Sequence, residues 1–168
     1  MQRKVGRPRS SVKGRLRTFS VPEGRAWGGF LATHQRLVHR LDTEMRERHG
    51  LSLSGYEVLL FLGRSDEGRL RMGDLAAAVL LTPSGLTRVV DRLVAEELVE
   101  RVVPSGNRRE IHAVLTAEGR KRLLAAHDTH HEGVRRWFLS RCSAEDLERL
   151  AAVWAAIDLG LAEQEPGA

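Results

Sequence analysis

The sequence contains one cysteine, Cys142, so no disulfide can form within the chain, and this usage suits a reducing compartment such as the cytoplasm. No apolar run approaches the roughly 18 residues of a membrane span. No apolar stretch follows the basic N-terminus, as it would in a secretory signal. Aromatic residues make up 5% of the chain, which favours helices over a β-sandwich. We therefore expect one mainly helical, cytoplasmic domain with no membrane partner.

Enzyme motifs are also scarce. The sequence has no Gly-rich phosphate-binding loop and no nucleophile paired with a base in a recognisable frame. A helical metalloenzyme needs three or four ligands and a general base, and only the histidines near residue 130 offer a start. We predict that the chain has no catalytic residues and requires no cofactor. A helical metalloenzyme is the alternative, and metal-dependent turnover would support it.

Positive charge is concentrated at the N-terminus. Residues 1–25 hold eight arginines and lysines and one glutamate, a net charge of +7, so residues 26–168 carry −2 of the total of +5. The high isoelectric point therefore comes from the N-terminal segment and does not make the rest of the chain a nucleic-acid binder. Residues 1–22 are rich in basic residues, Gly, Pro and Ser, which predicts a disordered tail.

This tail contains a short motif at residues 6–9, Gly-Arg-Pro-Arg, which resembles the core of an AT-hook. In that interpretation Arg7 and Arg9 contact the minor groove or phosphates of DNA. Val5 stands where a basic residue is expected before the glycine. A generic basic tail that is attracted to phosphates explains the same residues.

Apolar periodicity predicts six helices. Their expected spans are 27–47, 54–62, 71–79, 82–97, 116–139 and 143–161. The second is expected to start at a capping box, Ser54 to Glu57, and the sixth at a weaker one, Ser143 to Asp146. Leu70 is predicted to lie in a very short strand. Residues 99–103 and 110–115 are β-rich runs around a Pro/Gly/Asn turn, which predicts a hairpin.

The fourth predicted helix has the features of a DNA-reading helix. Thr82 is a good N-cap, and Pro83 fits the first helical position. A turn of about three residues separates this helix from the third, as in a helix-turn-helix, where the second helix points its N-terminal residues at base edges. The expected DNA contacts are Arg71, Thr82, Ser84, Gly85, Thr87, Arg88 and Arg92, with Arg108 and Arg109 at the hairpin tip. The alternative for the tip arginines is an ion pair that braces the hairpin.

Several segments resemble the MarR family of transcriptional regulators. They are residues 71–76 (RMGDLA), 82–93 (TPSGLTRVVDRL), 107–109 (NRR) and 115–119 (LTAEG), and the resemblance extends over about residues 27–161. The family usually has an aspartate at the position of Asn107, where it forms a salt bridge in the wing. The resemblance implies a mainly α fold with a small β-hairpin wing, in which a winged helix-turn-helix is flanked by N- and C-terminal dimerisation helices.

The resemblance also implies an organisation and a function. The domain would span 23–162, with the winged helix at about 51–116 and the dimerisation helices at about 25–48 and 117–161, followed by a frayed 163–168. A homodimer would bind half-sites of a pseudo-palindromic operator as a repressor and be released by a small molecule. The apolar stripes of the first and sixth helices are wider than one winged helix can cover, which agrees with a dimer. A winged helix that contacts proteins and not DNA is the remaining alternative.

Candidate effector and metal residues complete the predictions. His34, Tyr56 and Trp137 pair polar tips with apolar bodies and could line a ligand pocket, or they are ordinary core residues. His127 and His131 are four residues apart on one predicted helix, a spacing that can hold zinc. Exposed histidines on a polar helix face are the alternative. Cys142 is expected to be an inert thiol.

Overall fold

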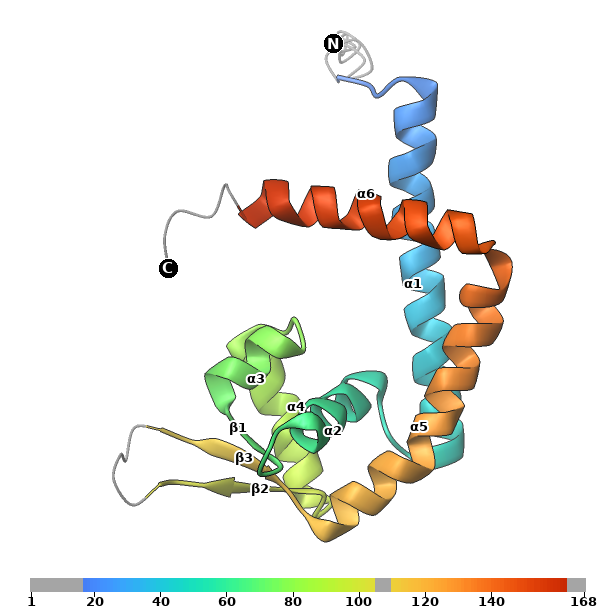
Figure 1. The fold of residues 1–168 in the computed structure, drawn as a ribbon. Helices are drawn as coiled ribbons and strands as arrows, with labels where there is room; N and C mark the ends of the chain where they lie inside the picture. The colour runs from blue at the N-terminus through green and yellow to red at the C-terminus, as the bar shows by residue number, and fades with distance from the viewer. Residues whose placement is uncertain (1–16, 105–109, 163–168) are drawn as a thin grey trace, which may run out of the picture. The chain divides into compact units, whose positions relative to one another are not determined.

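The computed structural model describes residues 17–104 and 110–162 (Figure 1). In chain order the elements are α1 (Val21–His49), α2 (Leu53–Arg64), β1 (Arg69–Arg71), α3 (Met72–Ala78), α4 (Pro83–Ala95), β2 (Val99–Val102), β3 (His112–Leu115), α5 (Ala117–Trp137), a 3₁₀ turn η2 (Leu139–Arg141) and α6 (Ala144–Ala162). The predicted fold class, mainly α with a small β-hairpin wing, is confirmed. The chain divides into two compact units between Gln35 and Arg36, within α1, and the helix-turn-helix and the sheet belong to the second unit.

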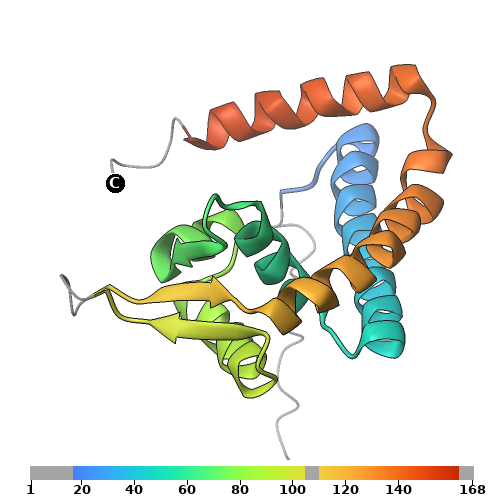
Figure 2. The same cartoon turned by 60° about the horizontal axis from the view of Figure 1, so that its bottom comes forward.

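The sheet has three antiparallel strands in the order β1-β3-β2. Leu70 pairs with Ala113, which confirms the short strand predicted at Leu70, and Val99 pairs with Leu115. Strands β2 and β3 run side by side in both views (Figure 1 and Figure 2). The hairpin strands are shorter than predicted, and the turn residues 105–109 lie outside the described residues.

Helices α3 and α4 form the expected helix-turn-helix. The Thr82 hydroxyl accepts a hydrogen bond from the Gly85 amide at 3.1 Å, and Pro83 takes the first turn of α4, as predicted. The turn between the helices depends on Leu80, whose φ of 53° is left-handed. The Leu81 amide then reaches back to the Ala76 carbonyl at 3.0 Å, which ends α3.

Helix α4 ends in a similar way. Glu97 has a φ of 58°, and the Leu98 amide donates to the Leu93 carbonyl at 2.8 Å. This six-residue closure satisfies a carbonyl at the helix end and turns the chain directly into β2. The apolar side of α4 lies in the core, because Leu86, Val90 and Leu93 are buried in the same cluster as apolar residues of the neighbouring α2, α3 and β2.

Helix α5 begins in close contact with the end of α4. The Thr116 hydroxyl accepts from the Gly119 amide at 2.9 Å and donates to the Glu97 carbonyl at 2.8 Å. A Cβ added at Gly119 would lie 2.0 Å from the Leu98 carbonyl oxygen, so only glycine fits this approach. The start of α5 is therefore fixed against the winged helix by both a hydrogen-bonded cap and a close backbone contact.

Three local predictions are wrong. Helix α1 starts at Val21, six residues before Trp27, and the Glu23 carboxylate accepts from the Ser20 amide at 2.7 Å. Hydrogen bonds from the Ser20 side chain and amide lower the pKa of Glu23. The segment Ser20-Val-Pro-Glu23 has the capping-box pattern that could have located this start.

The second helix is capped by Ser52 and not by Ser54. The Ser52 hydroxyl accepts from the Gly55 amide at 3.1 Å, and the Asp42 carboxylate accepts from the Leu53 amide at 2.8 Å. Because Asp42 lies on α1, eleven residues earlier, the local pattern could not indicate its role. Helix α2 also continues past residue 62, its predicted end, and Gly63 lies inside it, where the missing side chain makes room for Leu123 of α5.

The capping box at the sixth helix is confirmed. The Ser143 amide donates to Asp146 at 3.0 Å, and the Asp146 amide donates back to the Ser143 hydroxyl at 3.1 Å. None of the residues of α6 is buried within the single chain, although Trp154, Ile157 and Leu161 recur along it. None of the helices in the described part of the chain is long and apolar enough to cross a membrane.

Candidate DNA-binding surface

The exposed side of α4 presents the residues predicted to read DNA. Ser84, Thr87 and Arg88 are exposed, whereas Leu86 and Val90, between and after them, are buried. The Thr87 hydroxyl donates to the Pro83 carbonyl at 2.9 Å, which leaves its methyl group on the surface. Arg88 forms no hydrogen bond or ion pair with the residues that the structure describes. Its guanidinium is therefore available for a base edge or a phosphate.

The start of α4 is small and well ordered. A Cβ at Gly85 would lie 3.1 Å from the Thr82 hydroxyl oxygen, a close contact, so glycine keeps the cap compact. The Ser84 hydroxyl lies 3.3 Å from that of Thr82. Helix termini of this kind approach phosphates closely, because their first amides point outward.

The wing strand β2 is joined to α4 by Arg101. Its guanidinium forms an ion pair with Asp91 of α4 and a 3.4 Å hydrogen bond with the Thr87 carbonyl. This brace cannot be predicted from the sequence, because two opposite charges ten residues apart carry no local pattern. Asn107, which stands where the resemblance implies a salt-bridging aspartate, lies outside the described residues.

Arg71 lies at the other side of the sheet. It is the last residue of β1, and its guanidinium lies 3.2 Å from the Glu110 carboxylate. Both residues line an open cleft of about 520 Å³ that also includes Thr87 and Arg101. Arg71 is therefore partly engaged in an ion pair but remains beside the exposed face of α4.

The remaining predicted DNA contacts fall into two groups. Arg92 lines a separate, small cleft between α4 and the end of α1, together with Arg46 and Ser52. Arg7, Arg9, Arg108 and Arg109 lie outside the described residues.

The three candidate ligand residues are not brought together by any described contact. Tyr56 is fully buried, and its hydroxyl lies 2.9 Å from His127 Nδ1 on α5. The Trp137 indole instead donates to Glu44 on α1 at 3.0 Å, with Arg40 5.3 Å from its ring centroid. His34 belongs to the first unit, where it lies near Phe30. Neither of the two clefts includes Tyr56, Trp137 or His34.

The histidines of α5 form a cluster with Tyr56. The rings of His127 and His131 are 6.4 Å apart, and the His130 ring is 4.5 Å from that of Tyr56. Burial, helped by the nearby His127 and His131, lowers the pKa of His130, and burial raises the pKa of Tyr56. Among the described residues no group of three His, Cys, Asp or Glu side chains could hold a metal ion.

A short helix-turn-helix, an exposed second helix with a free arginine and a hairpin braced to that helix together define a winged helix-turn-helix protein. Comparison with known proteins then identifies the family. The sequence profile of the MarR family matches residues 49–110. No curated protein matches the chain significantly.

Three solved structures from Streptomyces coelicolor are similar, and each is of a MarR family transcriptional regulator. AbsC is 32% identical, with 89% of this chain and 100% of that chain covered and a TM-score of 0.82. Sco3205, solved in complex with DNA, is 28% identical over 91% and 96% of the two chains, with a TM-score of 0.84. Sco5413 is 25% identical over 88% and 100%, with a TM-score of 0.72.

The present chain thus belongs to the MarR family. It is a DNA-binding transcriptional regulator and not an enzyme.

Proposed function

We propose that this protein is a homodimeric repressor that binds a pseudo-palindromic operator in the cytoplasm and is released by a small molecule. The observation that carries the proposal is the outer face of α4. Its side chains Ser84, Thr87 and Arg88 are exposed, and Arg88 has no partner among the described residues. The ion pair between Arg101 and Asp91 orients the wing relative to this face. A helix and a neighbouring wing so arranged can contact the major groove and the adjacent minor groove.

Dimerisation is supported by apolar side chains that one chain leaves exposed. Trp27 and Leu31 of α1 are 53% and 46% exposed, and Ile157 and Leu161 of α6 are 49% and 63% exposed. Monomers rarely leave so many large apolar residues in contact with water, and a two-fold partner would cover the same residues on both chains. A dimer would place two α4 helices on half-sites whose centres are about 10–10.5 bp apart, or a multiple of that spacing.

The operator is tested first by selecting binding sites from genomic fragments and then by fluorescence anisotropy on the selected duplex and a shuffled duplex. Arg88→Ala is expected to reduce discrimination between these duplexes by about 1–3 kcal/mol, because a bidentate arginine–base contact is lost. Arg48→Ala, an exposed arginine at the end of α1, is the matched control and should keep the discrimination. Equal losses on both duplexes would refute base reading by Arg88.

The dimer is tested by sedimentation at micromolar concentration, where a monomer would refute it. Absence of binding to any duplex, with the dimer intact, would favour a winged helix that contacts proteins.

Release by an effector is tested by adding small phenolic or anionic compounds to the protein–operator complex. The predicted pocket residues are tested by Tyr56→Phe and Trp137→Phe, which should weaken release and preserve operator binding if these side chains contact the effector. In a separate experiment, zinc or a chelator is added to the protein–operator complex and release of the DNA is measured. A response to zinc that His127→Ala and His131→Ala abolish would favour the metal-responsive alternative.

A further inference from the structure

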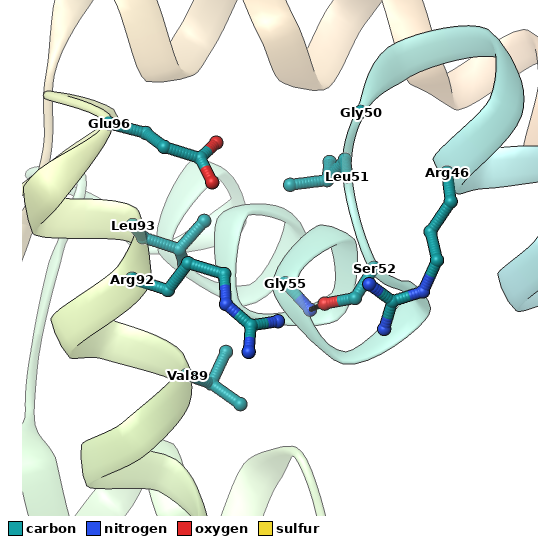
Figure 3. A pocket seen from close by; sticks show the side chains of 9 residues that line it. All are labelled: Arg46, Gly50, Leu51, Ser52, Gly55, Val89, Arg92, Leu93 and Glu96. Atoms are coloured by element: carbon teal, nitrogen blue, oxygen red, sulfur yellow. Dashed lines mark hydrogen bonds between the residues drawn. The ribbon is translucent and has the colours of Figure 1, made fainter.

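Two arginines from different helices share one small cleft beside the DNA-reading helix (Figure 3). Arg92 comes from the third turn of α4 and Arg46 from the last turn of α1. Their guanidinium groups point toward the Ser52–Gly55 hydrogen bond from opposite sides. We propose that Arg46 and Arg92 together clamp one phosphate of the DNA backbone at the rim of the major groove. This inference rests on the proposed DNA-binding mode and assigns Arg92 to the backbone instead of the bases.

The position of Arg92 around α4 supports a backbone contact. At 100° per residue, Arg92 lies about 90° from the centre of the face formed by Ser84, Thr87 and Arg88. A helix with its side chains is about 10–12 Å wide, and the major groove is about 12 Å wide. When the exposed face points at the base edges, the flank that carries Arg92 therefore faces one wall of the groove, where the phosphates lie.

The hydrogen-bonding state of the two arginines leaves donors available. Arg92 has no hydrogen bond or ion pair with any described residue. Arg46 uses only its Nε, which donates to Asp42 at 2.6 Å, so both of its terminal nitrogens remain free. Burial alone would raise the pKa of Asp42, but hydrogen bonds from Arg46 and Leu53 outweigh it and lower the pKa, so Asp42 is ionised at neutral pH and can pair with Arg46. Free arginine nitrogens from two sides match the oxygens of a phosphate.

The size of the cleft indicates which oxyanion it can take. Its volume is about 20 Å³, which is close to that of one water-sized group. A drug-sized effector does not fit, whereas one oxygen of a phosphate can enter while the rest of the group stays outside. The amides of Leu53 and Gly55 are already bonded to Asp42 and Ser52, so the two arginines supply the attraction. Since Glu96 lines the same cleft and forms no ion pair among the described residues, its charge should oppose binding.

The salt dependence of DNA binding tests the clamp. Each phosphate that a protein neutralises contributes about 0.9 to the slope of log K against log salt. Because both arginines hold one phosphate, the slope of the double variant Arg46→Gln/Arg92→Ala should be smaller than that of the wild type by about 0.9 per bound subunit. The slope of either single variant should not fall by more than this amount. Arg92→Ala should weaken binding about tenfold on the selected operator and on a shuffled duplex alike. An unchanged slope, or a loss of about 1.8 per bound subunit from two separate phosphates, would overturn the proposal.

Matched variants exclude a folding effect. Arg92→Lys keeps the charge and should keep the slope, and Arg48→Ala should behave as wild type. Glu96→Gln should strengthen binding to both duplexes, by up to about fivefold. If Glu96→Gln weakens binding or leaves it unchanged, this carboxylate does not face a phosphate and the clamp is refuted.

Two further arms identify the source of the oxyanion. Replacing single operator phosphates by neutral methylphosphonates should reveal one position per half-site that weakens wild-type binding but not binding of the double variant. Inorganic phosphate at constant ionic strength should raise the melting temperature of wild type and double variant equally in the absence of DNA. Selective stabilisation of the wild type, with no sensitive methylphosphonate position, would indicate a free-anion site and overturn the clamp. A wild-type protein that does not discriminate the operator would instead refute the proposed function.

Discussion

Gly119→Ala is expected to destabilise the protein strongly, because the joint between α4 and α5 has no room for a methyl group. The new Cβ would lie 2.0 Å from the Leu98 carbonyl oxygen and 2.9 Å from a Leu115 methyl. Close C···O contacts in proteins are about 3.3–3.6 Å, so the backbone must move by more than about 1 Å. That movement strains the hydrogen bond from the Thr116 amide to the Leu98 carbonyl, which is 3.2 Å long.

The magnitude follows from three contributions. Overpacking a rigid site costs about 1–3 kcal/mol. Weakening the hydrogen bonds from the Thr116 amide to Leu98 and from the Thr116 hydroxyl to Glu97 costs about 1 kcal/mol each. Alanine is better than glycine in a helix by about 1 kcal/mol, which partly compensates. We expect a net loss of about 3 kcal/mol in the free energy of unfolding.

Urea unfolding followed by circular dichroism, at one protein concentration, measures this loss as a lower midpoint with an unchanged slope. Gly73→Ala is the matched control, because no atom lies within 4 Å of its added Cβ, and it should be neutral or stabilising. A Gly119→Ala protein within about 0.5 kcal/mol of wild type would show that α5 is not in close contact with Leu98, and the reasoning would fail.

Three further predictions concern other sites. Leu80→Gly should raise the free energy of unfolding by about 0.5–1 kcal/mol, because Leu80 is 92% exposed and its left-handed backbone costs more than the added entropy of glycine; a lower urea midpoint at unchanged slope refutes this. A double-mutant cycle of Arg101→Ala and Asp91→Ala should give a coupling of about 0.2–1 kcal/mol, and zero coupling means that the wing is not braced there. Because the pKa of His130 is lower in the folded protein than its ordinary value of about 6.5, the unfolded chain takes up this proton first as the pH falls. The contribution of neutral His130 to stability is therefore complete above about pH 6.5 and is lost as the pH falls through the lowered pKa. His130→Asn should therefore flatten the fall in unfolding free energy below pH 6.5, and an unchanged pH profile would contradict the assignment.

The parts of the fold that depend on neighbouring residues could be predicted from the sequence. Thr82 and Pro83 mark the start of α4 because a cap and a ring-fixed first turn act within four residues of each other. The apolar spacing of Leu86, Val90 and Leu93 likewise indicates which side of that helix is buried.

Interactions between distant residues could not be predicted. Asp42 accepts from the Leu53 amide across a turn and so supports the helix start at the Ser52 cap, whereas the local pattern at Ser54 predicts the wrong cap. The sequence alone assigns Tyr56 and His127 to two separate candidate sites, a ligand pocket and a metal site, but one hydrogen bond joins them in the structure. Such pairs depend on how helices pack, which no local spacing encodes.

The exposed residues of α4 and the residues that hold this helix in the fold are different, and this separation affects how the regulator can evolve. Among the described residues, Ser84 and Arg88 form no hydrogen bond or ion pair with another helix or strand, whereas Leu86 and Asp91 hold the helix and the wing in place. Exchanging the exposed residues should therefore change which operator is bound at little cost in folding. Gene duplicates could acquire new targets by a few substitutions on this face, and a transplanted set of these side chains is a practical route to redirecting the protein to a chosen promoter.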